Sequence, residues 1–426
     1  MSKKIFLFIL VFVSTVFSQR NFNRTDGKRP EFNLRKPVLI ESNIVPSDLG
    51  FVCYFTYKIP FNNILFLKDG DNFTGGISFT IEVHKDDVYL KSETVNNKIS
   101  VIDYNLTNSE SDYLEGLLKV NLNEGKYLIR PALKIDNLNK DILIKPFPLL
   151  VDSLKSNSVL SPVVVYNQKL NSQDEYYFRL FNSEGIVPYS VSDFNIVIPA
   201  IDTSLTEIKA VIKQNDIEIV NKILQPVETI GFDIAQIDNS VCIVDNKENG
   251  KIKLFLLTEF STKLKEGNAL LTIEANGKKQ EFDLVVGWPD KPKTLSNPEF
   301  AIKILEHITP GPELDNLTDG DEEDYYDNLI KYWKQFDQNK ATAFNEVMNE
   351  FYQRADYAVK EFSTPSNRDG TNSDRGRIYV KYGKPDEIER SYSEKDNTIE
   401  IWIYENIGKR FVFSDKNGLG NFTLLK

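Results

Sequence analysis

Histidine is scarce in this chain, which has only His84 and His307. Neither has a second histidine or a cysteine at ligand spacing, and this excludes the usual zinc-binding patterns. The sequence also lacks a G-x-S-x-G elbow, a P-loop and a dinucleotide fingerprint. We therefore assign no metal site, no cofactor and no catalytic residue. His307 lies late in a predicted helix, where the helix dipole favours a cation.

Cysteine is equally rare, with Cys53 and Cys242 in two separate strand-like runs, FVCYFTYKI and SVCIVD. An exported protein permits a disulfide, but a bridge between two domains requires close Cα atoms. Free cysteines are among the most buried residues. We therefore expect two buried free thiols, with a disulfide as the alternative.

Long apolar runs are absent except at the N-terminus, MSKKIFLFILVFVSTVFSQR. Lys3 and Lys4 precede the apolar run Ile5–Phe17, and Ser18 is a small residue before a cleavage point, so residues 1–18 are predicted to be a signal peptide. A membrane anchor is the alternative, but the run is shorter than the roughly 20 residues that span a bilayer. We expect a soluble protein in the periplasm or outside the cell.

The net charge is −11, which argues against nucleic acid and anionic membranes as partners. An apolar content of 41% is enough for sizeable cores. At roughly 100–200 residues per domain, 426 residues predict about three domains.

Residues 19–36 are polar and basic and predict a flexible lead-in. Short strand-like runs separated by turn clusters then recur in residues 37–152 and again in residues 153–286. Strands at about 8–12-residue spacing predict two immunoglobulin-like β-sandwiches. Asn276-Gly277 marks the clearest hairpin of the chain.

The prolines of GWPDKP break this pattern, so residues 287–294 are predicted to be a linker. The apolar period then changes to that of helices in residues 295–426. Ser296 or Asn297 caps the first predicted helix, and a third is expected over about Ala341–Phe362. The second follows the acidic run Asp319–Asp327, which we attribute to the helix dipole; a calcium loop would need ligands at Leu317 and Tyr326.

Residues 375–382, RGRIYVKY, alternate and are predicted to form a strand ended by Gly383 and Pro385. Strands over Thr398–Ile407 and Lys409–Leu425 complete a small antiparallel sheet. Ile399, Ile401 and Ile403 are predicted to face the core of this α+β domain.

The opposite face of that sheet is the predicted partner-binding surface, because exposed arginine and aromatic residues are common in interface hot spots. Its five residues are Arg377, Tyr379, Lys381, Trp402 and Tyr404. In the alternative interpretation, Arg377 only pairs with Glu400 or Glu389, and Trp402 packs on the helices.

The segment DRGRIYVKYGKPDEIE is followed by an I-W-x-Y strand and an R-F-V-F strand. With these residues the chain resembles, from about Leu295 onward, the bacterial GWxTD domain family. The naming motif reads Gly370-Thr371-Asn372-Ser373-Asp374, so Thr371 and Ser373 differ from the family pattern. The matching positions are Gly370, Asp374, Arg375, Gly376, Tyr382, Gly383, Pro385 and Asp386.

The resemblance implies an extracytoplasmic protein with β-rich regions before the domain, and it implies no established reaction. We expect a non-enzymatic exported protein whose C-terminal domain engages a protein or glycan at the cell envelope. The alternative is a hydrolase of cell-surface polymer that uses paired carboxylates, since aspartate and glutamate are abundant.

Overall fold

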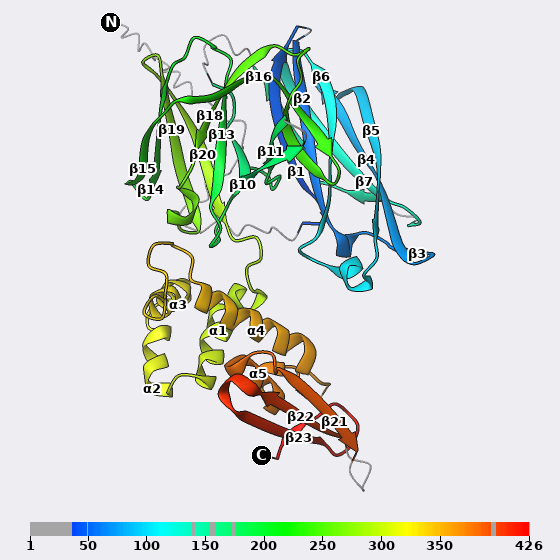
Figure 1. The fold of residues 1–426 in the computed structure, drawn as a ribbon, viewed down its shortest axis with the longest axis vertical. Helices are drawn as coiled ribbons and strands as arrows, with labels where there is room; N and C mark the ends of the chain where they lie inside the picture. The colour runs from blue at the N-terminus through cyan, green and yellow to red at the C-terminus, as the bar shows by residue number, and fades with distance from the viewer. Residues whose placement is uncertain are drawn as a thin grey trace, which may run out of the picture. The chain divides into compact units, whose positions relative to one another are not determined.

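The computed structural model describes residues 36–48, 50–138, 141–152, 159–172, 175–365, 367–392 and 398–425. The chain forms two compact units, Met1–Gly287 and Trp288–Lys426 (Figure 1). Strands make up 50% and helices 21% of the structure, so the prediction of a mostly β protein is confirmed. The predicted signal peptide, residues 1–18, and nearly all of the lead-in lie outside the described residues.

The first part of Met1–Gly287 contains two sheets. One has the order β1-β2-β6, and the other runs β3-β4-β7-β8, with β5 on β4 and β9 on β7. Their bounds are β1 Leu39–Ser47, β2 Gly50–Pro60, β3 Leu67–Asp69, β4 Asn72–Lys85, β5 Val88–Val101, β6 Tyr113–Leu122, β7 Gly125–Ile135, β8 Asp141–Leu143 and β9 Phe147–Val151. Alternate residues of β2, β4 and β7 face one shared core, which includes Phe55, Phe79 and Ile129.

The second part of this unit contains a closed barrel, β10-β11-β17-β16-β18-β13, and a five-stranded sheet, β12-β20-β19-β14-β15. The bounds are β10 Val163–Ser172, β11 Glu175–Leu180, β12 Val187–Pro188, β13 Phe194–Ala200, β14 Ile208–Gln214, β15 Ile217–Leu224, β16 Pro226–Ile237, β17 Ser240–Asp245, β18 Lys251–Leu257, β19 Gly267–Ala275 and β20 Lys278–Gly287. The hairpin predicted at Asn276-Gly277 is confirmed, and φ is positive at both residues.

Strand β2 joins these two parts because it is buried on both faces. Phe55 packs into the first core, whereas Tyr54 packs among barrel residues. The Tyr54 hydroxyl donates to Asp233 Oδ1 at 2.8 Å, and Lys119 Nζ donates to the same oxygen at 2.7 Å. The two ranges predicted as sandwiches therefore share buried surface.

Both cysteines are free and buried, as predicted. Burial raises the pKa of the Cys53 thiol to about 12 and that of Cys242 to about 11. Because the thiolate is the reactive form, both side chains are poor nucleophiles in the folded protein.

Trp288–Lys426 begins with helices. Their bounds are α1 Pro298–Ile304, α2 Gly311–Leu314, α3 Tyr325–Lys334, α4 Glu346–Phe362 and α5 Asp374–Tyr382. Asn297 caps α1, and Asn345 caps α4, which therefore begins later than the predicted Ala341. Residues from the predicted linker pack in this unit: the Trp288 ring lies 5.2 Å from that of Phe344.

A four-stranded antiparallel sheet follows in the order β21-β22-β23-β24. Its strands are β21 Glu387–Tyr392, β22 Thr398–Tyr404, β23 Lys409–Asp415 and β24 Thr423–Leu424. The predicted strand over residues 375–382 is wrong, because this segment is helix α5. Ser373 caps the helix by accepting from Gly376 N at 3.0 Å, and Gly383 ends it with φ of 81°. The signals at the two ends of the segment therefore predict its helical structure better than the alternation of its residues does.

Candidate functional site

The naming motif forms a turn that leads into α5. Gly370–Asn372 is a 3₁₀ turn, and Ser373 Oγ donates to Gly370 O at 2.7 Å. Asp374 Oδ2 accepts from Leu424 N at 2.6 Å, which ties the start of α5 to the last strand. The motif side chains therefore bind their own chain.

Two glycines of the family pattern are required by close packing. A Cβ atom on Gly370 would lie 2.1 Å from Ala358 O, and one on Gly376 would lie 1.9 Å from Gly370 O. Both distances are too short for a real contact, and a backbone oxygen could move away from a new Cβ atom only if the helices moved apart. Gly370 and Gly376 thus let α4, the motif turn and α5 pack together.

A buried charge cluster lies where α5 meets the sheet. Glu400 is 1% exposed and accepts from Trp402 Nε1 at 2.7 Å and from Arg390 Nε at 2.9 Å. Arg375 Nη1 lies 3.5 Å from the same carboxylate, and its guanidinium lies over the rings of Phe362 and Phe422. Burial lowers the pKa of Arg375, and the Glu400 charge opposes that effect. The cluster neutralises a carboxylate inside the core.

The five predicted partner-binding residues do not share an exposed sheet face. Trp402 is 2% and Tyr404 4% exposed, and the Tyr404 hydroxyl donates to Gly383 O at 2.8 Å. The alternation of β22 was predicted correctly, but its two faces were assigned the wrong way round. The large rings of Trp402 and Tyr404 face the core, and Ile401 is only half-buried.

The remaining three residues lie on α5. Arg377 pairs with Asp374 and donates to Asn372 O, so neither Glu389 nor Glu400 is its partner. Tyr379 stacks on Tyr357 with ring centroids 4.4 Å apart. Lys381 is exposed. Partner binding by these residues stays a prediction, but their placement on one sheet face is wrong.

The other family positions also hold the domain together. The ring of Tyr382 stacks on Phe411, and its hydroxyl accepts from Lys409 Nζ at 2.7 Å. Asp386 Oδ2 accepts from Glu405 N at 2.7 Å, and Pro385 is buried. These contacts fasten the end of α5 to the sheet.

His307 is half-buried and lies in the 3₁₀ turn that follows α1. Burial and the nearby Arg377 lower its pKa. Its surroundings therefore favour the neutral ring, and not the cation expected at a helix end. The ring is hydrogen-bonded to the backbone of Thr371, whereas its Nε2 atom has no hydrogen-bond partner among the described residues.

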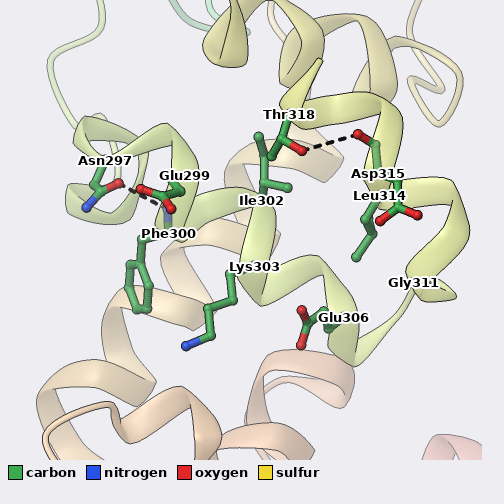
Figure 2. A pocket seen from close by; sticks show the side chains of 10 residues that line it. All are labelled: Asn297, Glu299, Phe300, Ile302, Lys303, Glu306, Gly311, Leu314, Asp315 and Thr318. Carbon is green, nitrogen blue, oxygen red and sulfur yellow. Dashed lines mark hydrogen bonds between the residues drawn. The ribbon is translucent and has the colours of Figure 1, made fainter. Parts of the chain in front are cut away.

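An open groove lies between α1 and α2, with a volume of about 480 Å³. We call it the α1–α2 groove, and Figure 2 shows the side chains that line it. They are Asn297, Glu299, Phe300, Ile302, Lys303, Glu306, Gly311, Leu314, Asp315 and Thr318. Ile302 and Leu314 are buried at its floor and Phe300 is half-buried.

The rim of the groove is charged. Glu299, Glu306 and Asp315 are exposed, and Lys303 is the only basic residue among the lining side chains. In the described part of the chain, none of these three carboxylates forms a side-chain hydrogen bond or an ion pair. Figure 2 shows Glu299 and Asp315 on either side of Ile302 in that view. The groove thus combines an apolar floor with negative edges.

Sequence reasoning did not single out these residues. Glu299, Lys303 and Glu306 follow i, i+4, i+7 spacing and could have been placed on one helical face. Asp315 follows the Pro310-Gly311-Pro312 break, and no pattern links it to α1. Among the described residues, no group of three His, Cys, Asp or Glu side chains is placed to hold a metal ion. No described helix is long and apolar enough to cross a membrane.

Comparison with known proteins gives a family match in the C-terminal part of the chain. No curated protein matches the chain. A model of the GWxTD domain matches residues 269–424, starting inside β19 and therefore before the predicted Leu295. The C-terminal part of this chain thus matches the GWxTD domain, as the sequence resemblance predicted.

Proposed function

We propose that this is an exported, non-enzymatic binding protein whose C-terminal GWxTD domain engages a protein partner at the cell envelope. The observation that carries the proposal is the α1–α2 groove, which is open, has an apolar floor and bears unpaired charges at its rim. Groups of this kind give a surface both affinity and specificity. The side chains of the motif residues Ser373 and Asp374, by contrast, already bind backbone atoms of the domain.

In this proposal the β-rich unit presents the C-terminal domain. Its two parts are treated as immunoglobulin-like sandwich modules held together by buried polar contacts. One such contact joins Arg179 Nη2 to Glu115 Oε1 at 3.3 Å, and another joins Asn182 Nδ2 to Tyr57 O at 3.0 Å. Glu115 is 2% exposed, so its carboxylate is compensated inside the protein by groups of the other part.

The burial pattern supports binding over hydrolysis of a polymer. A hydrolase that uses two carboxyl groups needs one of them kept protonated, which burial usually achieves. Glu299, Glu306 and Asp315 are exposed to water, and the buried Glu400 is held by Arg375 and Arg390. None of these four is a buried carboxyl group without a cationic partner.

Capture from native envelope extracts tests the proposal, with the full chain immobilised. Gly311 lines the groove, and a Cβ atom placed there meets no described atom within 4 Å, so we expect Gly311→Tyr to add a ring at the groove without a clash at the backbone. Gly250 in the β-rich unit is equally open and provides the matched control Gly250→Tyr. Neither glycine has a positive φ that would strain a new side chain.

We expect the unmodified chain and Gly250→Tyr to retain the same partner, which purified protein then confirms in a two-component assay. Gly311→Tyr should lose that partner while keeping an unchanged melting temperature. Equal retention by both variants would place binding outside the groove. Release of cleaved polymer by the purified chain would favour the hydrolase alternative.

A further inference from the structure

We infer that the α1–α2 groove recognises a lysine or arginine of a partner protein where that residue is flanked by apolar side chains. This inference rests on the proposed function and specifies the chemistry of the partner. It depends on three features of the groove: its floor, its charges and the elements that supply them.

The floor takes the apolar part of the ligand. Ile302 is 4% and Leu314 7% exposed, and the half-buried Phe300 adds a ring to the apolar part of the lining. A volume of about 480 Å³ lies within the range of about 300–1,000 Å³ that is usual for ligand pockets. That volume is large enough for more than one side chain.

The rim selects a cation. The lining contains three carboxylates and one ammonium group, that of Lys303, so it carries an excess of negative charge. A partner segment with acidic side chains would meet repulsion there, whereas a basic one would be attracted. Lysine and arginine also carry long aliphatic stems, which can lie on an apolar floor while the charged end stays in water. One side chain can therefore satisfy both features.

The charges come from two separate elements, and this argues for a specific site. Glu299 and Lys303 lie on α1, and Glu306 lies in the turn that follows it. Asp315 lies at the C-terminal end of α2. A cation above Ile302 and Leu314 can approach carboxylates from both sides, which an isolated helix face does not offer.

Synthetic ten-residue peptides serve as probes against the full chain, with binding followed by fluorescence anisotropy. One peptide alternates lysine with leucine. The others alternate glutamate with leucine, glutamine with leucine, and lysine with serine, so that charge and apolar contact are removed one at a time. We expect the lysine–leucine peptide to bind at least about tenfold more tightly than the other three, and its affinity to fall with added salt.

Substitutions in the groove locate the site. Glu299→Gln, Glu306→Gln and Asp315→Asn should each weaken the lysine–leucine peptide by about two- to fivefold, and the triple variant by more than about tenfold. Lys303→Gln should tighten binding, because it removes the only positive charge of the lining. The matched control is Glu313→Gln, which changes an exposed charge of α2 that does not line the groove and should leave binding unchanged.

Three outcomes would overturn the inference. If the glutamine–leucine peptide bound as tightly as the lysine–leucine peptide, the groove would recognise apolar surface alone. A tenfold gain in affinity on deleting residues 1–35 would mean that the chain's own basic segment occupies the groove. Self-association that the triple variant abolishes would mean that a second copy does so.

The peptide result and the envelope capture separate the two proposals. An envelope partner that is lost in Gly311→Tyr, together with no peptide preference, would refute only the inference about chemistry. Selective peptide binding without any envelope partner would refute the proposed function and leave the recognition chemistry in place.

Discussion

Glu400 and Glu299 lie in the same unit and show two different fates of a carboxylate. Glu400 is buried, and two arginines and an indole N–H surround it. Glu299 is exposed at the edge of a groove and has no protein partner among the described residues. The first carboxylate is committed to the fold, because a buried charge must be compensated within the protein. The second keeps its charge available for a ligand.

The same contrast separates the family motif from the groove. Asp374, Ser373 and the family-pattern glycines Gly370 and Gly376 contact backbone atoms of their own domain. The three rim carboxylates of the groove, Glu299, Glu306 and Asp315, have no such partner among the described residues. Agreement with the family pattern therefore identifies residues that build this domain, and the open charges mark the place where we propose that it binds.

Replacing Trp402 with alanine should give the largest effect. Trp402 is 2% exposed and lies 4.9 Å from Phe413 and 5.6 Å from Phe362, measured between ring centroids. We expect a loss of about 3–5 kcal/mol in the free energy of unfolding. Urea unfolding of the full chain measures this loss, and Trp402→Phe should cost less. A loss below about 1 kcal/mol would mean that Trp402 lies on an open surface after all.

Replacing Arg375 with alanine should be the next most damaging change, at about 2–4 kcal/mol, because it leaves Glu400 partly uncompensated in the core. Arg377→Ala is the control: Arg377 is 51% exposed and pairs locally with Asp374, so its loss should cost at most about 1 kcal/mol. The double variant Arg375→Met/Glu400→Leu should recover much of the stability. Equal costs for the two single arginine variants would contradict a special role for the buried pair.

Asp233 should make the β-rich unit sensitive to acid. Burial raises its pKa, but hydrogen bonds from Lys119, Tyr54 and Asn246 outweigh burial and hold the pKa below its ordinary value. A pKa lowered by folding stabilises the protein above roughly pH 4, and that contribution disappears as the pH falls through the folded pKa.

Thermal unfolding between pH 7 and pH 2 tests this dependence. The unmodified chain should lose stability below roughly pH 4 more steeply than Asp233→Asn, which cannot titrate at this position. Parallel curves for the two proteins would mean that other carboxylates dominate acid unfolding.

The smallest effect on stability is expected for Glu299→Gln. An exposed carboxylate without protein partners should change the free energy of unfolding by less than about 0.5 kcal/mol. The same urea titration provides the measurement. If this variant were as damaging as Arg375→Ala, the distinction between structural and available carboxylates would be lost.

Local signals predicted much of the secondary structure. Asn276-Gly277 identified the β19–β20 hairpin because both positions require positive φ. Ser296 and Asn297 before Pro298 indicated the start of α1, and the structure shows that Asn297 is the cap, since its side chain satisfies an N–H group that the helix leaves free. Such signals depend on a few neighbouring residues and can be recognised without knowing the fold.

The candidate site was harder to predict. Alternation in β22 indicated two faces, but choosing the buried one required knowing that Arg375 would compensate Glu400 from another element. Residues 375–382 alternate well enough for a strand, yet Ser373 and Gly383 provide the ends of a helix. The groove was missed because Asp315 and Glu299 come together only when α2 packs beside α1.

The sequence by itself determined that this protein is mostly β and that its C-terminal part resembles the GWxTD family. Short strand-like runs with their turn signals and a run of matching residues are enough for these, whereas the structure decided between free thiols and a disulfide. Only the tertiary structure decided which face of β22 is core and which carboxylates remain open. Burial and charge compensation depend on residues far apart in the chain, and their positions become fixed only when the elements pack.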